Sequence, residues 1–267
     1  MIALDIQSVG VMAPGLPGWQ ASLPVLRGEI AYQAEALPTL KPNMLKPNER
    51  RRTTQTIKLA LAVAEDALSQ VQRPSELLSV YASSWGDLDI INQICLALTQ
   101  AERPVSPTQF HNSVHNAPAG YGSIGTGYRQ ASNSIAGQQG TFAAGLLEAA
   151  VQATCENKPI LLVAYDLVAP DPLITLIPNT PAFALALLLS PHVDKASGGE
   201  RLASIKLAPV AEAGETSLQQ SLLEQLRISQ PAAHGLPLLQ TVAQQETKKL
   251  LLPYLPELGL QVEVAPC

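Results

Sequence analysis

Two stretches of this chain are apolar at nearly every position, and they restrict the fold more than any other feature. Residues 159–165 read PILLVAY and residues 182–190 read AFALALLLS. A strand with one face in water alternates apolar and polar residues, whereas a strand buried on both faces reads as a continuous apolar run. Helical patterns separate several of the predicted strands. The chain is therefore predicted to be an α/β protein whose sheet is covered on both faces.

The rest of the chain predicts further strands and helices. Asn48 can cap a helix that begins after Pro47, and the second half of that helix is apolar all round, which predicts burial on most sides. The Gly- and Pro-rich residues 15–47 are predicted to form one long loop. Strands are expected at 2–7, 77–83, 130–135, 204–209 and 260–264, and helices at 49–70, 90–100, within 106–121, and at 138–155, 218–225 and 238–254.

Charge and cysteine content narrow the class of function. The net charge is −5 and the pI is about 5.4, so no overall positive field attracts nucleic acid or an anionic membrane. Cys95, Cys155 and Cys267 are odd in number and widely spaced, which is typical of reduced thiols in a cytosol. The N-terminus does not resemble a signal peptide, and no apolar run reaches the ~18 residues of a membrane span. We expect a cytoplasmic protein that needs no cofactor.

Residues 132–150 (SNSIAGQQGTFAAGLLEAA) predict a strand, a tight turn and a helix. A thiol or hydroxyl at such a turn lies against the helix N-terminus, which lowers its pKa and stabilises a developing anion. Here the turn consists of Gly137, Gln138 and Gln139, and none of these can be a nucleophile. Taken alone, the pattern is also typical of an ordinary crossover with glycine in its turn.

Residues 110–127 (FHNSVHNAPAGYGSIGTG) contain a glycine pattern that can be read as a nucleotide site. Gly120, Gly122 and Gly125 match the dinucleotide-binding motif G-x-G-x-x-G. That motif requires a buried strand before it and a helix after it. Polar residues precede the glycines here, and the following segment predicts a strand. The motif is therefore a weak indication.

The same residues also contain two histidines that could bind a metal. His111 and His115 are four residues apart and would share one face of a helix, although no acidic residue or cysteine lies between Glu102 and Glu148. We favour the alternative that the histidines and the neighbouring amides satisfy one another and the backbone. No metal site is predicted.

Taken in order, these segments resemble the N-terminal half of a β-ketoacyl synthase. In such enzymes a polar segment precedes a strand, an Ala-Cys-x-x-Gly-Thr-type elbow, a long Ala-rich helix and a buried strand such as PILLVAYD. Gly140 and Thr141 match the Gly-Thr pair, which puts the cysteine position at Gly137. The stretches LKPNERRRTTQTIKLALAVAEDAL and FHNSVHNAPAGY resemble the short ketosynthase-like chain length factors of aryl polyene biosynthesis.

The resemblance implies a thiolase-like α/β fold with a mixed sheet, truncated relative to a full ketosynthase. Residues 1–200 would carry the family features, and residues 201–267 would be a reduced C-terminal part of the same single domain. The histidine motifs of the family's C-terminal half are absent, because His192 and His234 lie in other contexts. Since a turn without a thiol cannot form the acyl-enzyme, the resemblance implies a noncatalytic chain length factor.

Such a subunit would form a heterodimer with an active ketosynthase, pairing through the strand before the elbow. It would meet the acyl carrier protein through that complex, and it would shape the tunnel that holds the growing polyketide. The residues expected at the tunnel floor or the interface are Phe110, His111, Ser113, Val114, Asn116 and Phe142.

Three arginines and two cysteines allow further interpretations. Arg50, Arg51 and Arg52 are predicted at a helix N-terminus, where the helix dipole opposes cations. They are read first as a solvated charge run, and otherwise as a contact with the partner subunit or an acidic carrier protein. Cys95 and Cys155 are interpreted as structural thiols. The alternative functions are a standalone thiol-dependent acyltransferase and a nucleotide-binding α/β module.

Overall fold

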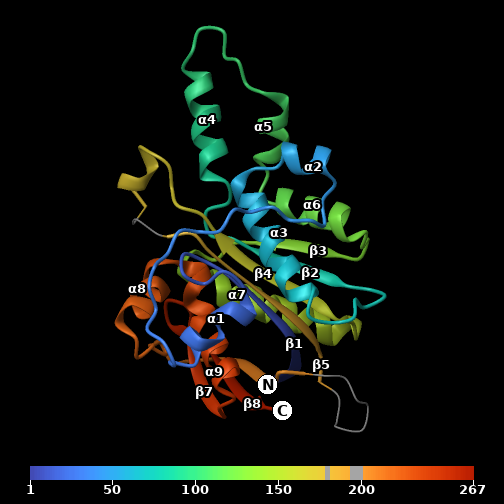
Figure 1. The fold of residues 1–267 in the computed structure, drawn as a ribbon, viewed down its shortest axis with the longest axis vertical. Helices are drawn as coiled ribbons and strands as arrows, with labels where there is room; N and C mark the ends of the chain where they lie inside the picture. Colours follow the sequence, from blue (N-terminus) through green and yellow to red (C-terminus); the bar gives the residue numbers. More distant parts are fainter. Residues whose placement is uncertain (178–180, 193–200) are drawn as a thin grey trace.

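The computed structural model describes residues 1–177, 181–192 and 201–267, and one eight-stranded sheet forms its centre (Figure 1). The strands are β1 (Ile2–Met12), β2 (Leu78–Ala82), β3 (Ser132–Ile135), β4 (Ile160–Asp166), β5 (Phe183–Pro191), β6 (Ala203–Val210), β7 (Lys248–Leu255) and β8 (Leu258–Pro266). Their order across the sheet is β3-β2-β4-β5-β1-β6-β8-β7. The first three strands in this order are parallel, and the other neighbours pair antiparallel. The predicted α/β fold with a mixed sheet is confirmed.

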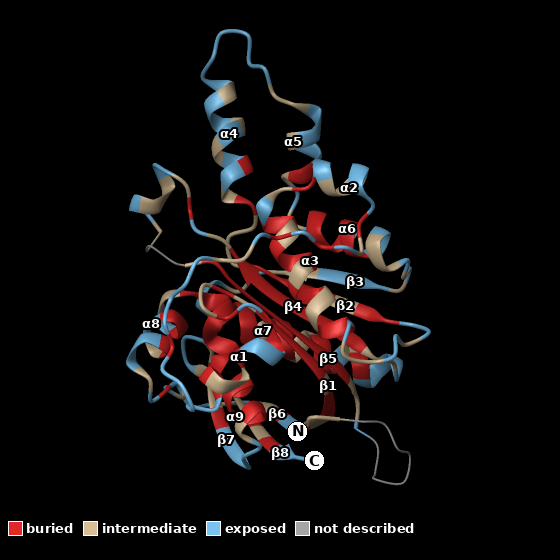
Figure 2. Cartoon of the chain, in the orientation of Figure 1, coloured by how far each residue is buried: buried red, intermediate tan, exposed pale blue. Residues whose placement is uncertain are grey.

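Both faces of the central strands are buried, as their apolar sequences predict. Successive side chains of a strand point to opposite faces, and in β4 Leu162 joins one core cluster while Leu161 joins another. Leu185 and Ala184 of β5 divide in the same way. Helix α7 (Thr141–Glu156) covers the first face and α3 (Gln55–Leu68) covers the second (Figures 1 and 2).

The other helices surround this centre, and two of them project from it. They are α1 (Trp19–Leu26), α2 (Pro47–Arg52), α4 (Leu88–Leu98), α5 (Pro107–Asn112), α6 (Ala117–Thr126), α8 (Ser221–Ser229) and α9 (Leu236–Gln244), with short 3-10 helices η1 (Gln138–Gly140), η2 (Leu173–Thr175) and η4 (Pro231–Gly235). Helices α4 and α5 form the mostly exposed projection at the top of Figure 2. Among the described residues, none of the helices has the length and apolar content needed to cross a membrane.

The N-terminal third differs from the prediction in two places. The long loop expected at 15–47 contains α1, whose sequence signal is weakened by Pro24 inside the helix. The single helix expected at 49–70 is two helices, α2 and α3. They are separated because Thr53 is extended and the Thr54 side chain caps α3 by accepting from the backbone N–H of Ile57 at 3.2 Å. The apolar second half is buried as predicted.

The C-terminal part differs from the prediction in its helix bounds and in one strand, and the helix expected at 218–225 is α8 (Ser221–Ser229). A single helix was expected at 238–254, but α9 ends at Gln244 and β7 begins at Lys248. Gln245 ends the helix in a left-handed conformation with φ of 53°. The residue that ends a helix in this conformation is usually glycine. Because a glutamine takes that place here, no glycine in the sequence marks the end of α9.

Candidate functional site

The turn between β3 and α7 has a strained backbone. Gln138, the first residue of η1, has a φ of 51°, which is unusual for a residue other than glycine. Its side chain is exposed, as is that of Gln139. A sharp turn of this kind between a strand and a helix presents one side chain at the end of the sheet. The structure therefore holds an elbow whose presented residue is a glutamine.

Hydrogen bonds to one threonine hold the elbow in place. Thr141 Oγ1 accepts from the backbone N–H of Gly137 at 3.0 Å and lies 2.7 Å from the carbonyl oxygen of Gln138, to which it donates. Ser84 Oγ donates to the same carbonyl at 2.9 Å and lies 2.7 Å from Thr141 Oγ1. Since Ser84 follows β2, the elbow is tied to the end of the neighbouring strand.

A buried carboxyl lies beneath this connection. Asp166 ends β4 and is fully buried, and it accepts from Ser83 Oγ at 2.6 Å and from the backbone N–H groups of Ser84 and Trp85 at 3.1 Å each. Burial raises its pKa to about 6, because desolvation opposes the charged form more strongly than these hydrogen bonds favour it. The carboxyl thus orders the loop after β2. Sequence reasoning missed it, because Asp166 simply ends an apolar strand.

The C-terminal part of the chain packs directly against the elbow. His234 in η4 donates from Nδ1 to the carbonyl oxygen of Gln139 at 2.8 Å, since a carbonyl can only accept. Burial lowers the pKa of this histidine, which favours the neutral ring. A Cβ added to Gly140 would lie 2.0 Å from the backbone oxygen of Tyr254 in β7. The sequence pattern around His234 did not predict this contact, which joins residues 95 positions apart.

A second feature near the sheet edge is an apolar groove of about 880 Å³ between α5 and α6. Phe110, Val114 and Ile124 line it and are 67%, 52% and 62% exposed, which is unusual for large apolar side chains. Helix α6 also contacts β3, so the groove lies near the open edge of the sheet. The predicted site residues found in this groove are Phe110, His111, Val114 and Asn116.

Two other residues predicted for the same surface do not line the groove. The Ser113 hydroxyl caps α5 locally by donating to the carbonyl oxygen of Phe110 at 2.8 Å. Phe142 is fully buried in the main core, where its ring lies against Gly235 and not against the groove. The structure therefore separates Phe142 from the other residues of the predicted set.

Comparison with known proteins assigns the fold. The family described as beta-ketoacyl synthase, N-terminal domain, matches residues 26–252. The chain belongs to the β-ketoacyl synthase family. A search among curated protein sequences finds no significant match.

Several solved structures of ketosynthase complexes share the fold of this β-ketoacyl synthase-like chain. One is a chain from the ketosynthase ApeO in complex with its chain length factor ApeC from Xenorhabdus doucetiae, with 22% identity, a TM-score of 0.72 and coverage of 98% of this chain and 100% of that one. The ishigamide ketosynthase/chain length factor has 13% sequence identity, a TM-score of 0.72 and coverage of 99% of each chain. The AntDE:AntF complex, a ketosynthase with its acyl carrier protein, has 10% sequence identity, a TM-score of 0.76 and coverage of 100% of this chain and 99% of that one.

The glycine pattern is not a nucleotide site in this β-ketoacyl synthase fold. Gly120, Gly122 and Gly125 lie inside α6 and not in a turn between a strand and a helix. Gly122 allows close packing, since an added Cβ would lie 2.2 Å from the Tyr81 hydroxyl. Gly122 therefore allows α6 to pack closely against β2.

The two histidines of this segment lie in different surroundings. His111 is exposed at the apolar groove, whereas His115 Nε2 lies 3.0 Å from the carbonyl oxygen of Ser83. Within the described ranges, there is no group of three or more His, Cys, Asp or Glu residues that could hold a metal ion.

The cysteines and arginines require two corrections. Cys95 and Cys155, interpreted as structural thiols, are both exposed, on α4 and α7, so neither packs in the core. Arg50, Arg51 and Arg52 form the last turn of the short helix α2 and not the N-terminus of a long one. Cations are favoured in the last turn of a helix by the helix dipole, so the dipole of α2 favours these arginines. Helix α2 ends there because Thr54 caps the start of α3.

Proposed function

We propose that this chain is the noncatalytic chain length factor of a ketosynthase heterodimer. The observation that carries the proposal is the elbow, which has the strained backbone of a nucleophile turn but presents Gln138 instead of a thiol or hydroxyl. The left-handed residue favours Gln138 over Gly137 as the position that a catalytic cysteine would take. An amide cannot form an acyl-enzyme, so a second subunit must supply that step.

The open edge of the sheet supports a pairing role. Strand β3 is hydrogen-bonded to β2 on one side and ends the sheet on the other. Ser132 and Asn133 are exposed, and a row of free backbone groups on such an edge can pair with a strand of another chain. The pale blue strand β3 in Figure 2 is the surface that would meet the ketosynthase.

The groove between α5 and α6 supports a role in shaping the product. Its exposed Phe110 and Val114 lie beside the proposed pairing edge, where a partner would cover them. We propose that these side chains form part of the tunnel floor, and that their size limits the length of a polyene or other polyketide chain. The eight strands of the described residues form one sheet, which supports residues 1–267 acting as a single domain.

Co-expression with a ketosynthase tests the pairing. Ala131 and Ile135 bond to β2 through their carbonyl oxygens, and because strand residues alternate, Ser134 directs its backbone N–H outward. Ser134→Pro removes this outward donor, and Ser134→Ala is a matched control because the serine Oγ has no hydrogen-bond partner. We expect size-exclusion chromatography to show a heterodimer with the native chain and the alanine variant, and a weakened one with the proline variant. Equal heterodimer formation by all three would refute pairing through β3.

Product analysis tests the tunnel role separately. We expect Phe110→Ala to lengthen the products of the complex and Val114→Phe to shorten them, because the first enlarges the groove and the second fills it. Unchanged product lengths with both variants in an intact heterodimer would refute this role while leaving the pairing intact.

A further inference from the structure

A small and largely enclosed cavity lies next to the apolar groove, at the base of the projection formed by α4 and α5. About 10 Å³ of it is open to the centre of a water molecule. Its wall is built from the start of α3, the loop after β2, the segment from the end of α5 to the start of α6, and the end of β4. Val114 lines both this cavity and the apolar groove.

Two polar atoms of residues in the wall of this cavity have no hydrogen-bond partner among the described residues. They are the hydroxyl oxygen of Tyr165 and the Oδ2 atom of Asp87. Tyr165 is fully buried at the end of β4, and Asp87 is only 9% exposed before the start of α4. Because buried polar groups in native proteins are nearly always hydrogen-bonded, these two atoms indicate a binding site for a small polar ligand.

The groups around the cavity are held in place by other contacts. Asp87 Oδ1 caps α4 by accepting from the backbone N–H of Ile90 at 3.1 Å, which fixes the direction of the second oxygen. His115 Nε2 lies 3.0 Å from the carbonyl oxygen of Ser83. The ring of Tyr165 packs edge-on against Tyr81, with 6.4 Å between the ring centroids. The site is therefore preorganised on the loop after β2 and on the central sheet.

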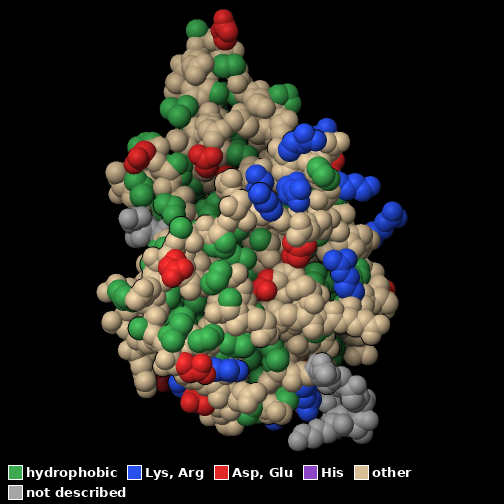
Figure 3. Space-filling view, in the orientation of Figure 1, with side chains coloured by type: hydrophobic (Ala, Val, Ile, Leu, Met, Phe, Trp, Pro, Cys, Tyr) green, Lys and Arg blue, Asp and Glu red, His purple; other side chains and the backbone are tan. Residues whose placement is uncertain are grey.

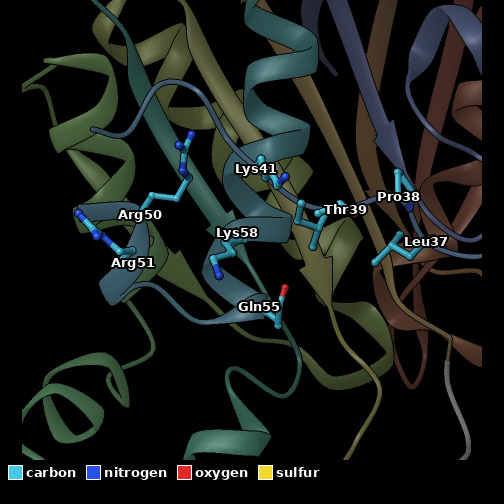
Figure 4. Close-up of a pocket in the computed structure, with 9 residues that line it drawn as sticks. Leu37, Pro38, Thr39, Lys41, Arg50, Arg51, Gln55 and Lys58 are labelled. Atoms are coloured by element: carbon cyan, nitrogen blue, oxygen red, sulfur yellow. The ribbon is translucent and has the colours of Figure 1, made fainter. Parts of the chain in front are cut away.

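The cations of the chain do not neutralise Asp87. Within the described ranges it forms no ion pair. Figure 3 shows Lys and Arg side chains over the region of α2 and α3, and Figure 4 shows Gln55 and Lys58 at a separate outer groove of about 700 Å³. Thr56 and Ile57, which lie between them in the sequence, line the enclosed cavity instead. The first turn of α3 thus separates the surface cations from the Asp87 carboxylate.

The proton of Tyr165 distinguishes a water molecule from a metal ion as the ligand. Burial raises the pKa of this phenol well above its usual value, so the hydroxyl keeps its proton. A metal ion could contact both oxygen atoms but would leave this proton without an acceptor. A water molecule can accept from the hydroxyl and donate to the carboxylate. The volume of about 10 Å³ also corresponds to the room that a single water needs.

We propose that this cavity binds one water molecule, which accepts a hydrogen bond from the Tyr165 hydroxyl and donates one to Asp87 Oδ2. This bridge fixes the base of α4 to the central strand β4. Of the described residues of α4, Ile90 alone is buried, so the bridge is a large part of its attachment. Because Val114 lines the same cavity, the bridge also steadies one wall of the apolar groove. The site goes beyond the proposed function and requires no partner subunit.

A high-resolution crystal structure of the full-length chain tests the site directly. We expect one ordered water within hydrogen-bond distance of both the Tyr165 hydroxyl and Asp87 Oδ2. Crystals soaked in rubidium chloride should show no anomalous peak at this position. A rubidium peak there would replace the water by a cation site and overturn the proposal. A direct hydrogen bond between Tyr165 and Asp87, or a cavity without electron density, would overturn it as well.

Hydrogen exchange of the α4 backbone tests what the water does. Tyr165→Phe removes the hydroxyl and keeps the ring. Tyr81→Phe is the matched control, because Tyr81 is buried in the same core cluster but does not line the cavity. We expect amides of α4 to exchange about fivefold faster in Tyr165→Phe and to change less than about twofold in the control. Equal exchange rates in the native chain and both variants would refute the bridge.

A second variant separates a bridge from two independent effects. Asp87→Ser keeps a side-chain oxygen that can cap α4 but removes Oδ2. If one water joins the two residues, Tyr165→Phe should change the exchange of α4 less than about twofold once Asp87→Ser is present. Effects that multiply in the double variant would contradict a shared water. Circular dichroism of each variant checks that the chain has folded.

Discussion

Replacing Asp166 by asparagine should remove a pH-dependent loss of stability that burial of this carboxyl imposes on the fold. The carboxyl is fully buried at the end of β4, and its pKa is raised from 3.8 to about 6. A carboxyl with a raised pKa binds its proton more tightly in the folded state than in the unfolded state. The contribution of this carboxyl to the free energy of unfolding is therefore largest below pH 3.8, and it declines as the pH rises to about 6.

The size of this effect follows from the two pKa values. The difference between 3.8 and about 6 corresponds to about 3 kcal/mol of unfolding free energy, of which about 2 kcal/mol is lost between pH 4 and pH 7. Asparagine cannot ionise, so this loss disappears in the variant. Its Oδ1 can still accept from Ser83 and Trp85, but the backbone N–H of Ser84 loses its acceptor, which costs about 1–3 kcal/mol at every pH.

Urea unfolding followed by circular dichroism at several pH values between 4 and 7 measures the effect. Other groups in the chain also titrate in this range, so the informative quantity is the difference in unfolding free energy between the native chain and Asp166→Asn. We expect the advantage of the native chain to shrink by about 2 kcal/mol from pH 4 to pH 7. A difference that stays constant over this range would show that Asp166 titrates near its ordinary pKa, and would refute the role assigned to its burial.

Four further substitutions test the elbow and the C-terminal part of the chain by unfolding measurements. Gln138→Gly relieves a left-handed φ, so it should leave stability unchanged or raise it by about 1 kcal/mol, whereas Gln139→Gly, whose φ is not positive, should lower it by about 0.5–1 kcal/mol. Gly140→Ala should lower stability by about 1–3 kcal/mol, because β7 must move away from the new methyl group. Arg227→Met should lower it by about 1–3 kcal/mol, because Glu224 and Glu215 lose the buried guanidinium that pairs with them at 2.7 Å and 2.8 Å, while both carboxylates keep contact with water. Equal effects at 138 and 139, or none at 140 and 227, would contradict these assignments.

The sequence predicts the centre of the fold well because burial there is decided by each strand alone. Strands β4 and β5 are apolar at almost every position, so both of their faces must be buried whatever the neighbouring segments are. Element boundaries are less predictable. The break at Thr53 and the end of α9 at Gln245 depend on backbone conformations that neither glycine nor proline marks.

In the candidate site, too, the sequence predicts the local patterns but not the contacts between distant segments. The elbow and the polar segment are local patterns, and the structure places Phe110 and Val114, which the family resemblance assigned to one surface, together in one groove. Phe142 lies elsewhere because its position on α7 faces the sheet, which sequence spacing within one segment does not reveal. The roles of Asp166 and His234 depend on contacts between distant segments, and no local pattern predicts these.

The C-terminal residues explain why the elbow keeps its shape without a nucleophile. His234 holds the carbonyl of Gln139, and the backbone of Tyr254 leaves room only for glycine at position 140. On the other side, Ser84 ties the carbonyl of Gln138 to the loop that Asp166 orders. The turn is thus fixed from both sides, whatever side chain it presents. Because the same turn connects β3 to α7, loosening it would displace the open edge strand, so retention of the strained turn is consistent with a pairing role for that edge.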